Sequence, residues 1–269
     1  MTEEERCVRP GLGPFSLDEV YLGDCLALMA KLPEACIDLV ITDPPFAISF
    51  KANKLSYKRK LTNVIEGYQE IKPEDYLGFT RKWMSQVRRV LRPSGSMYVF
   101  SGWNSLKDML IAIDETGFTV VNHIIWKYQF GVCTKYRFVT SHYHCIYVCK
   151  DVKRRKFHPY PRFPPEKRGR HGHKLHYKDK EDVWEIKREY WKNKMKTPTK
   201  LPSELVGKIL DYSSDPGDLV MDPFLGSGQV ALVSKEKGRH FLGFEIVKGY
   251  HDFARRRLGL RESTEEKKE

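Results

Sequence analysis

The sequence lacks any long apolar run. No stretch of its 269 residues approaches the ~18 apolar residues of a membrane-spanning helix, and residues 1–6 are acidic and polar, unlike a secretion signal. The six cysteines include no Cys-x-x-Cys pair, which favours reduced, mostly buried thiols over zinc or redox pairs. We therefore expect an intracellular, cytoplasmic protein.

Acidic residues are scarce in one region. The net charge is +12, and residues 151–200 hold 17 Lys and Arg against 7 Asp and Glu, so this segment alone contributes +10. Such a concentration indicates a polyanionic partner, with nucleic acid as the first candidate. The alternative is the solvated basic surface of a thermostable protein.

Short apolar runs alternate with helical patterns over most of the chain. This alternation predicts an α/β protein with a doubly wound, mainly parallel sheet. We expect one domain formed by residues 16–150 and 181–260, with flexible termini at 1–15 and 261–269. Residues 151–180, rich in proline and basic side chains, should form an extended insertion.

The stretch Asp43-Pro44-Pro45-Phe46 follows the apolar run Ile37–Ile41, which is short, β-branched and typical of a buried strand. In parallel α/β sheets, sites form at the carboxyl ends of strands, so Asp43 should lie at a crevice. The two prolines lack N–H donors and leave their carbonyl oxygens free to accept hydrogen bonds. The stretch could therefore hold a planar group that carries an NH2.

A second motif, Asp222-Pro223-Phe224-Leu225-Gly226-Ser227-Gly228, lies between an expected strand and an expected helix. Its glycines allow close approach to a ligand, and the helix N-terminus offers N–H groups. Glu245 ends the next strand, where an acidic residue can accept from ribose hydroxyls. Taken alone, this loop also fits a nicotinamide-dependent oxidoreductase, because it matches a loose dinucleotide fingerprint.

Together the two motifs resemble the amino-group DNA methyltransferases that use S-adenosylmethionine. The stretch Asp43–Phe46 is similar to the family's catalytic motif, and Asp222–Gly228 is similar to its cofactor loop. The catalytic motif comes first, which resembles the circularly permuted β subclass. The resemblance implies a Rossmann-like methyltransferase domain, S-adenosyl-L-methionine as cofactor, double-stranded DNA as partner with a location at the nucleoid, and a homodimer in some members.

Two further stretches extend the resemblance. Tyr21–Cys25 resembles an element whose Asp holds the cofactor's adenine amino group, and Lys196–Pro202 resembles an element that meets its methionine end. The implied cofactor contacts are Asp24, Cys25, Asp43, Thr199, Lys200, Asp222, Phe224, Gly226, Ser227, Gly228 and Glu245. For Asp222, bracing its own loop is the alternative role.

An exocyclic amine is a poor nucleophile because its lone pair is delocalised into the base. Two acceptors on its N–H bonds pull the nitrogen toward tetrahedral geometry, and by resemblance these are the Asp43 carboxylate and the Pro44 carbonyl. The base should be flipped out of the duplex and stacked on Phe46. Adenine N6 is favoured because the family's adenine enzymes more often begin the motif with Asp, and cytosine N4 is the alternative.

Two basic segments are expected to clamp the duplex: the loop 50–67 and the insertion 151–180. The predicted phosphate contacts are Lys51, Lys54, Lys58, Arg59, Lys60, Lys153, Arg154, Arg155, Lys156, Arg168 and Arg170. A DNA-binding protein without catalysis remains an alternative function.

Several other residues carry two interpretations. Trp126 and Tyr128 either line the base pocket or pack in the core. No metal site is expected, because the spacing of His142, His144, Cys145 and Cys149 matches no usual finger. The histidines at 171, 173 and 176 are interpreted as solvated or phosphate-facing.

Overall fold

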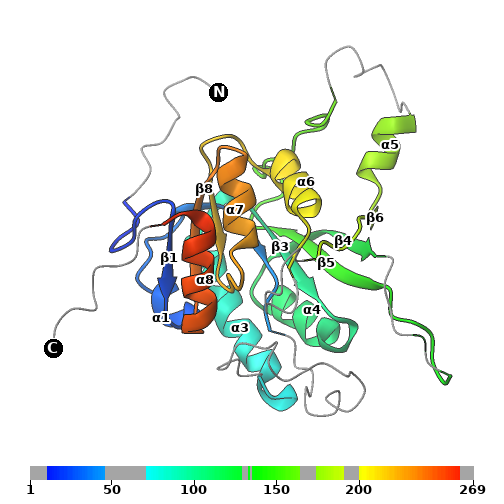
Figure 1. Cartoon of the computed structure of the whole chain (residues 1–269), viewed down its shortest axis with the longest axis horizontal. Coiled ribbons are helices and arrows are strands. Elements are labelled where there is room, and N and C mark those ends of the chain that lie inside the picture. Colours follow the sequence, from blue (N-terminus) through cyan, green and yellow to red (C-terminus); the bar gives the residue numbers. More distant parts are fainter. Residues whose placement is uncertain are drawn as a thin grey trace.

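The structure is a computed structural model and describes residues 11–45, 71–128, 133, 135–163, 174–190 and 200–260. Its strands are β1 (Glu19–Leu22), β2 (Ile37–Thr42), β3 (Leu91–Ser101), β4 (Thr119–Lys127), β5 (His142–Cys149), β6 (Val183–Glu185), β7 (Leu219–Asp222) and β8 (His240–Glu245) (Figure 1). Its α-helices are α1 (Cys25–Met29), α3 (Pro73–Val90), α4 (Leu106–Glu115), α5 (Lys174–Lys180), α6 (Ser203–Ser213), α7 (Gln229–Glu236) and α8 (Lys248–Leu258), and a short 3-10 helix, η3 (Trp103–Ser105), precedes α4.

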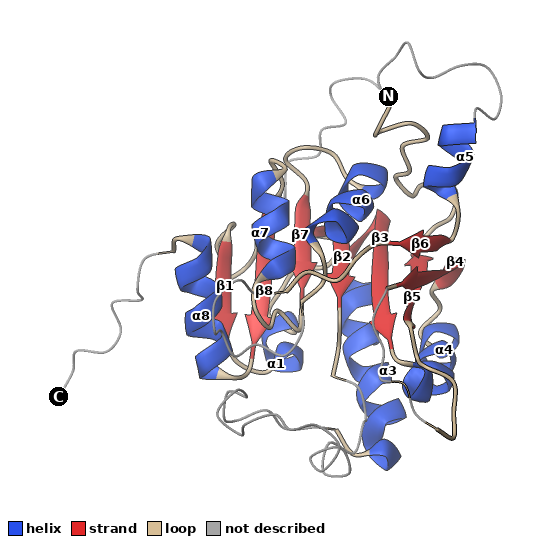
Figure 2. Ribbon diagram, turned by 45° about the vertical axis from the view of Figure 1, so that its right-hand side comes forward, coloured by secondary structure: helices blue, strands red, loops and turns tan. Residues whose placement is uncertain are grey.

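The described strands form one sheet in the order β1-β8-β7-β2-β3-β5-β4-β6. Neighbouring strands are parallel except at the two pairs that involve β5, which runs against the others. This arrangement confirms the predicted doubly wound, mainly parallel α/β fold. Figure 2 shows the strands between two helical layers, and none of the described helices is long and apolar enough to cross a membrane.

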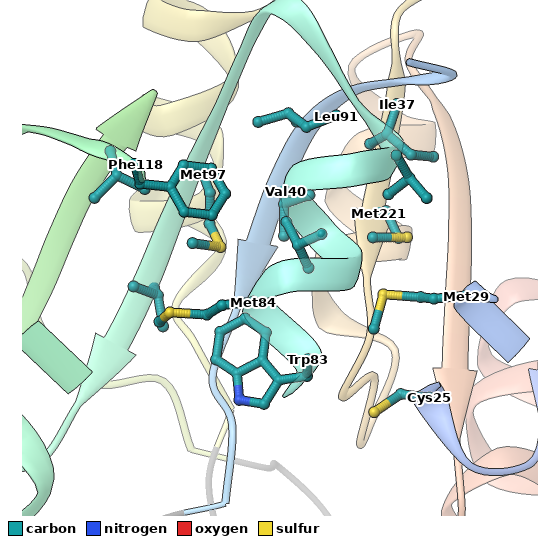
Figure 3. Packing of buried hydrophobic residues seen from close by; sticks show 14 of the residues in the cluster. Cys25, Met29, Ile37, Val40, Trp83, Met84, Leu91, Met97, Phe118 and Met221 are labelled. Carbon is teal, nitrogen blue, oxygen red and sulfur yellow. The ribbon is translucent and has the colours of Figure 1, made fainter. Parts of the chain in front are cut away.

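The two faces of the sheet have separate cores because side chains alternate along each strand. On β2, Val40 joins a cluster with the helices α1, α3 and α4, whereas Leu39 and Ile41 join a cluster with α6 and α7. Figure 3 shows the first cluster, in which Trp83 and Met84 of α3 pack beneath β2. Burial on both faces explains why the β2 sequence is a continuous apolar run.

Strand direction divides the connections between two edges of the sheet. We call the edge at which β2, β7 and β8 end the carboxyl edge, and the opposite one the amino edge. Residues 43–45, 223–228 and 246–247 therefore leave from the carboxyl edge. Because β5 is antiparallel, the β4–β5 connection also lies at the carboxyl edge, and residues 150–156 lie at the amino edge.

The flexible arm expected at 1–15 stays a prediction, and only its last five residues are described. Leu12 is buried, and the Phe15 ring packs against Tyr21 at 4.9 Å and Phe244 at 5.5 Å between ring centroids. Both residues thereby join the core cluster that also contains α1 and α3. Residues 1–10 and 261–269 lie outside the described residues.

The insertion 151–180 is also more ordered than predicted where it is described. It contains α5, and His176 is 3% exposed, with its ring 4.4 Å from Phe163 and 5.0 Å from Tyr160. The interpretation of His176 as solvated is therefore wrong. Tyr160 and Phe163, which lie among the prolines, supply apolar surface, and an argument from proline and basic content alone does not take this into account.

Candidate functional site

The two motifs meet at the centre of the carboxyl edge. Strands β2 and β7 are neighbours, and the Thr42 hydroxyl donates to Asp222 Oδ1 at 2.9 Å. The same oxygen accepts from the backbone N–H of Phe224 at 3.1 Å. From β2 the chain continues through α3 on one face, and from β7 it continues through α7 on the other, so the pair marks the switch point at which α/β sheets bind ligands.

The Asp43 carboxylate stands directly after β2. Its Oδ1 is buried and accepts no hydrogen bond from the described residues. Burial raises the pKa of Asp43 to about 7, and the charge of Arg188 acts in the opposite direction. A buried carboxylate oxygen without a donor is costly, so the site favours a ligand that supplies one. Pro44 is buried beside it and Pro45 is half-buried.

Two tyrosines and an arginine lie around Asp43. Tyr128 follows β4 and Tyr143 begins β5, with ring centroids 5.5 Å apart. The Arg188 guanidinium lies 3.8 Å from the Tyr128 ring centroid and 5.4 Å from that of Tyr143. The pKa of Tyr143 is raised by burial and by the charge of Asp43, which places both groups in one electrostatic environment. This wall of planar groups suits a planar ligand.

The aromatic residues of β4 divide between core and site. Trp126 is buried, and its indole N–H donates to the Ile186 carbonyl at 2.8 Å, so its polar edge is already satisfied by the core. Its ring contacts Tyr128 at 5.5 Å and Tyr143 at 5.8 Å. Trp126 therefore supports the wall, whereas Tyr128 forms part of it.

The glycine loop is shaped by two left-handed residues. Gly226 has φ +54° and Gly228, the N-cap of α7, has φ +73°, conformations that favour glycine. A Cβ on Gly228 would lie 3.0 Å from Ala254 of α8, whereas one on Gly226 would meet nothing nearer than 3.9 Å. Gly228 thus packs against α8, and the Gly226 side of the loop has room for a ligand.

Glu245 connects the glycine loop to the end of β8. Its Oε2 accepts from Gly226 N–H at 2.7 Å and its Oε1 from Val247 N–H at 2.8 Å. Burial raises the pKa of Glu245, and these N–H donors lower it. Each carboxylate oxygen retains a second lone pair, so hydroxyl groups of a ligand can still be accepted.

The Gly23-Asp24 element joins the same corner. Gly23 N–H donates to the Glu245 carbonyl at 2.9 Å, and Asp24 Oδ1 caps α1 by accepting from Ala27 N–H at 3.0 Å. Cys25 is buried, and its pKa is raised to about 12 by burial and by the Asp24 charge, so it is a neutral thiol.

Phe224 and Ser227 have contacts of their own. The Phe224 ring packs edge-on against Trp83 at 5.5 Å and lies 5.9 Å from Phe79, so it anchors the loop in the α3 core. Ser227 is buried, and its carbonyl accepts from Arg257 at 3.0 Å.

Lys200 takes part in a network beside the glycine loop. Its ammonium donates to Glu189 Oε2 at 2.6 Å, and Glu189 Oε1 accepts from Ser203 N–H at 2.6 Å. Gln229 then donates to the Ser203 hydroxyl at 2.9 Å and accepts from Arg257. Within the described contacts, Lys200 therefore acts through Glu189 and links the segment after β6 to the start of α7.

The basic turn at 153–156 lies on the amino edge. Lys156 Nζ forms ion pairs with Asp218 at 2.6 Å and Asp215 at 2.9 Å, just before β7 begins. From the start to the end of β5 the chain travels roughly 24 Å away from the carboxyl edge. The geometry therefore argues against the clamp role predicted for Lys153, Arg154, Arg155 and Lys156, and the reason is the reversed direction of β5.

Some predicted residues cannot be placed. Those outside the described residues are Phe46, Lys51, Lys54, Lys58, Arg59, Lys60, Arg168, Arg170 and Thr199. Among the residues that are described, no cluster of three or more His, Cys, Asp or Glu side chains could hold a metal ion. His123 Nε2 and His144 Nδ1 form a hydrogen bond of 2.8 Å, and burial lowers the pKa of His144 to about 4.

Sequence reasoning missed Arg188 and Tyr143. Their position relative to the strands could have identified them. Each is a polar or aromatic residue near the end of a strand that lies at the carboxyl edge, as Asp43 is. Two exposed apolar side chains were also missed, Leu22 at 44% and Ile246 at 66% exposure, which flank the Asp24–Glu245 corner. Such exposed side chains beside a polar corner can cover the flat face of a ligand ring.

The comparisons with known proteins agree with this geometry. The sequence model of a family described as DNA methylase (N6_N4_Mtase) matches residues 37–256. The type II methyltransferase M.BglII of Bacillus subtilis is 29% identical over 263 residues, covering 88% of this chain and 68% of that protein. M.HpaI of Haemophilus parainfluenzae is 27% identical over 238 residues, covering 87% and 72%.

Solved structures share the fold. The PvuII cytosine-N4-specific DNA methyltransferase superposes with a TM-score of 0.69 at 20% identity, covering 93% of this chain and 88% of that one. TTHA0409 of Thermus thermophilus, complexed with S-adenosyl-L-methionine, gives a TM-score of 0.65 at 23% identity, covering 90% and 93%. Because the family model spans both motifs and the sheet between them, the chain belongs to the N6/N4 DNA methylase family.

Proposed function

We propose that the chain transfers a methyl group from S-adenosyl-L-methionine to the exocyclic amine of a base flipped out of double-stranded DNA, with adenine N6 as the target and cytosine N4 as the alternative. One observation carries the proposal: Asp43, whose Oδ1 is buried, directly follows Thr42, and Thr42 is hydrogen-bonded to Asp222 at the start of the glycine loop. A methyl donor on that loop and an amine at Asp43 would face each other across this contact.

The residues around Asp43 fit an amine substrate. The Asp43 carboxylate and the Pro44 carbonyl would accept the two N–H bonds, which localises the lone pair on nitrogen and aligns it with the methyl group. The bound cofactor supplies an activated methyl group, so the site needs no strong base. Asp43, with a pKa of about 7, would stabilise the positive charge that develops on nitrogen and then accept the proton.

The other corner of the site fits the nucleoside end of the cofactor. Glu245 has lone pairs available for ribose hydroxyls, and Asp24 has an unshared carboxylate oxygen available for an adenine amine. The open side of Gly226 allows the methionine portion to lie close to the backbone. In this proposal Asp222 and Phe224 hold the loop, and Ser227, Gly228, Cys25 and Lys200 shape its surroundings.

The wall formed by Tyr128, Tyr143 and Arg188 supports a planar base next to Asp43. Adenine is proposed first because the motif begins with Asp, as is more common in the adenine enzymes of the family. Methylation of unmodified genomic DNA followed by nucleoside mass spectrometry tests the target. Detection of N4-methylcytosine without N6-methyladenine would select the alternative.

Further expectations remain proposals. The basic loop 50–67 follows the catalytic motif directly, so it is the segment proposed to bind phosphates at the carboxyl edge. Binding to chromosomal DNA would place the protein at the nucleoid, and assembly as a homodimer is proposed from the family resemblance. Sedimentation velocity without DNA measures whether the protein is a dimer, and the same measurement with DNA shows whether it forms a complex with DNA.

The central experiment is Asp43→Ala. Methyl transfer from tritiated cofactor to DNA should be abolished, while calorimetric titration shows cofactor affinity within about threefold of the unsubstituted protein, since the substituted group contacts the amine. Asp114→Ala, an exposed substitution at the end of α4, is the matched control. Undiminished transfer by Asp43→Ala would reject the assignment. Absence of transfer by the unsubstituted protein would favour a non-catalytic DNA-binding function.

A further inference from the structure

The loop between β4 and β5 leaves from the same edge of the sheet as Asp43. Lys127, the last residue of β4, pairs with His142, the first residue of β5, and the loop closes between them. Its stem residues Tyr128 and Tyr143 form part of the wall beside Asp43. Figures 1 and 2 both show its described residues 135–141 extending past the ends of the strands, away from α5.

The tip of this loop, residues 135–138 (Lys-Tyr-Arg-Phe), exposes large aromatic surfaces. Tyr136 is 95% exposed and Phe138 is 100% exposed, so neither ring packs against the described fold. Lys135 and Arg137 alternate with them. Aromatic residues are normally buried or placed where a partner covers them, and two neighbouring exposed rings therefore indicate a contact surface.

The charge around the tip selects the kind of partner. Residues 128–141, which connect β4 to β5, contain no Asp or Glu and carry Lys135 and Arg137. A tip with two cations and no acidic residue beside them in the sequence attracts a polyanion. On the connection after β3, at the same edge, Trp103 is also exposed, at 72%. Exposed aromatic rings interleaved with cations match the stacking surfaces that nucleic acids require.

The loop is long enough to reach into a duplex whose base occupies the Asp43 site. The eight Cα–Cα steps from Tyr128 to Tyr136 span at most roughly 27 Å when extended. A flipped base rotates about the backbone of a single nucleotide, so it stays close to the base stack that it has left. The reach of the loop exceeds this short distance.

We propose that residues 135–138 form a DNA wedge, in which Lys135 and Arg137 bind phosphates and the Tyr136 or Phe138 ring enters the base stack beside the extruded nucleotide. The inference rests on the proposed function and adds a second DNA contact, at the carboxyl edge. Insertion of a ring replaces stacking that is lost when the base leaves, as apolar wedges do at other kinked steps.

The first experiment uses the double variant Tyr136→Ala, Phe138→Ala in the full chain. The substrate is unmethylated DNA made by polymerase chain reaction, tested as duplex and after denaturation to single strands. Transfer to duplex should fall roughly tenfold or more, because stacking of one base on an aromatic ring stabilises binding to this extent. Transfer to single strands, which need no extrusion, and calorimetric cofactor affinity should stay unchanged.

A matched variant at the other edge provides the control. Tyr177→Ala removes a ring that is 70% exposed on α5 and should leave transfer to duplex unchanged. For the charges, Arg137→Gln should lower the salt dependence of duplex binding measured by fluorescence anisotropy, whereas Arg154→Gln on the amino edge should not.

Three outcomes would overturn the proposal: transfer to duplex at the original rate by the double variant, an equal loss with Tyr177→Ala, or a loss accompanied by a change in oligomeric state in sedimentation velocity. The last would assign the tip to contact between two copies of the chain. If the unsubstituted protein transfers no methyl group at all, the proposed function fails, and duplex affinity in the anisotropy assay still decides whether the tip binds DNA.

Discussion

Replacing the Asp43 carboxylate with a neutral amide should stabilise the free protein while it removes activity. Asp43 is half-buried as a residue, but its Oδ1 is buried and accepts no hydrogen bond from the described residues, and burial raises its pKa to about 7. Asp43→Asn keeps the shape of the side chain and removes the charge. We therefore expect the free energy of unfolding to increase at a pH at which Asp43 is ionised.

The magnitude follows from the pKa. Its rise from 3.8 to about 7 corresponds to about 4 kcal/mol. Between these two pH values the folded protein binds a proton that the unfolded chain releases, so stability falls as pH rises through this range. The effect is absent below 3.8 and complete above 7. Local relaxation and water entry reduce it, so we expect Asp43→Asn to stabilise by about 1–4 kcal/mol at pH 9.

Thermal unfolding at pH 9 and pH 5 measures this difference. For a chain of this size each kcal/mol shifts the midpoint by roughly 2–4 °C, so Asp43→Asn should unfold several degrees higher at pH 9. Its shift at pH 5 should be less than half as large, because pH 5 lies only a little above the ordinary carboxyl pKa of 3.8. Asp215→Asn is the contrasting control, because Asp215 pairs with Lys156 at 2.9 Å and, against the effect of burial, the hydrogen bond from Lys156 lowers its pKa, so that variant should be destabilised. A midpoint difference for Asp43→Asn that is the same at both pH values would refute the reasoning.

Three other changes have defined outcomes. Arg188→Gln removes the charge that lowers the Asp43 pKa, so the acid limb of the kcat–pH profile should move to higher pH, whereas Arg188→Lys should restore it in part. Gly228→Ala should destabilise by about 1–3 kcal/mol in urea unfolding because of its positive φ and its contact with α8, more than Gly217→Ala, where a Cβ meets open space. Glu245→Gln should weaken cofactor binding in calorimetry by roughly tenfold or more, because a side-chain amide cannot accept from both backbone N–H groups.

The centre of the site was predictable because its signals are local. A short β-branched run at residues 37–41 followed by prolines indicates a buried strand that ends abruptly. A glycine loop between a strand and a helix is equally distinctive. Parallel pairing then places both ends on one edge, and the sheet order makes β2 and β7 neighbours. The order itself was not predicted, because sequence patterns do not show which strands pair.

The position of the basic turn 153–156, on the edge opposite Asp43, has a topological cause. Composition identifies a cluster of cations but says nothing of the edge on which it lies. One antiparallel strand, β5, transfers the chain from the carboxyl edge to the amino edge within eight residues. The same reversal brings Tyr143 and the loop 135–138 to the catalytic side. Arg188 arrives there because β6 is parallel to β4. Strand direction, which depends on pairing distant in sequence, decided these placements.

In the candidate site, one carboxylate that lacks a hydrogen-bond donor is surrounded by groups with well-defined contacts. Asp222 accepts hydrogen bonds from Thr42 and Phe224, and both carboxylate oxygens of Glu245 accept from backbone N–H groups. The Phe224 ring packs against Trp83. Among these groups Asp43 alone has a buried oxygen for which the described residues provide no donor. We therefore expect the free energy that Asp43 costs the folded protein to be recovered in part when an N–H donor enters, which would make binding selective for an amine over a ring nitrogen or a carbonyl.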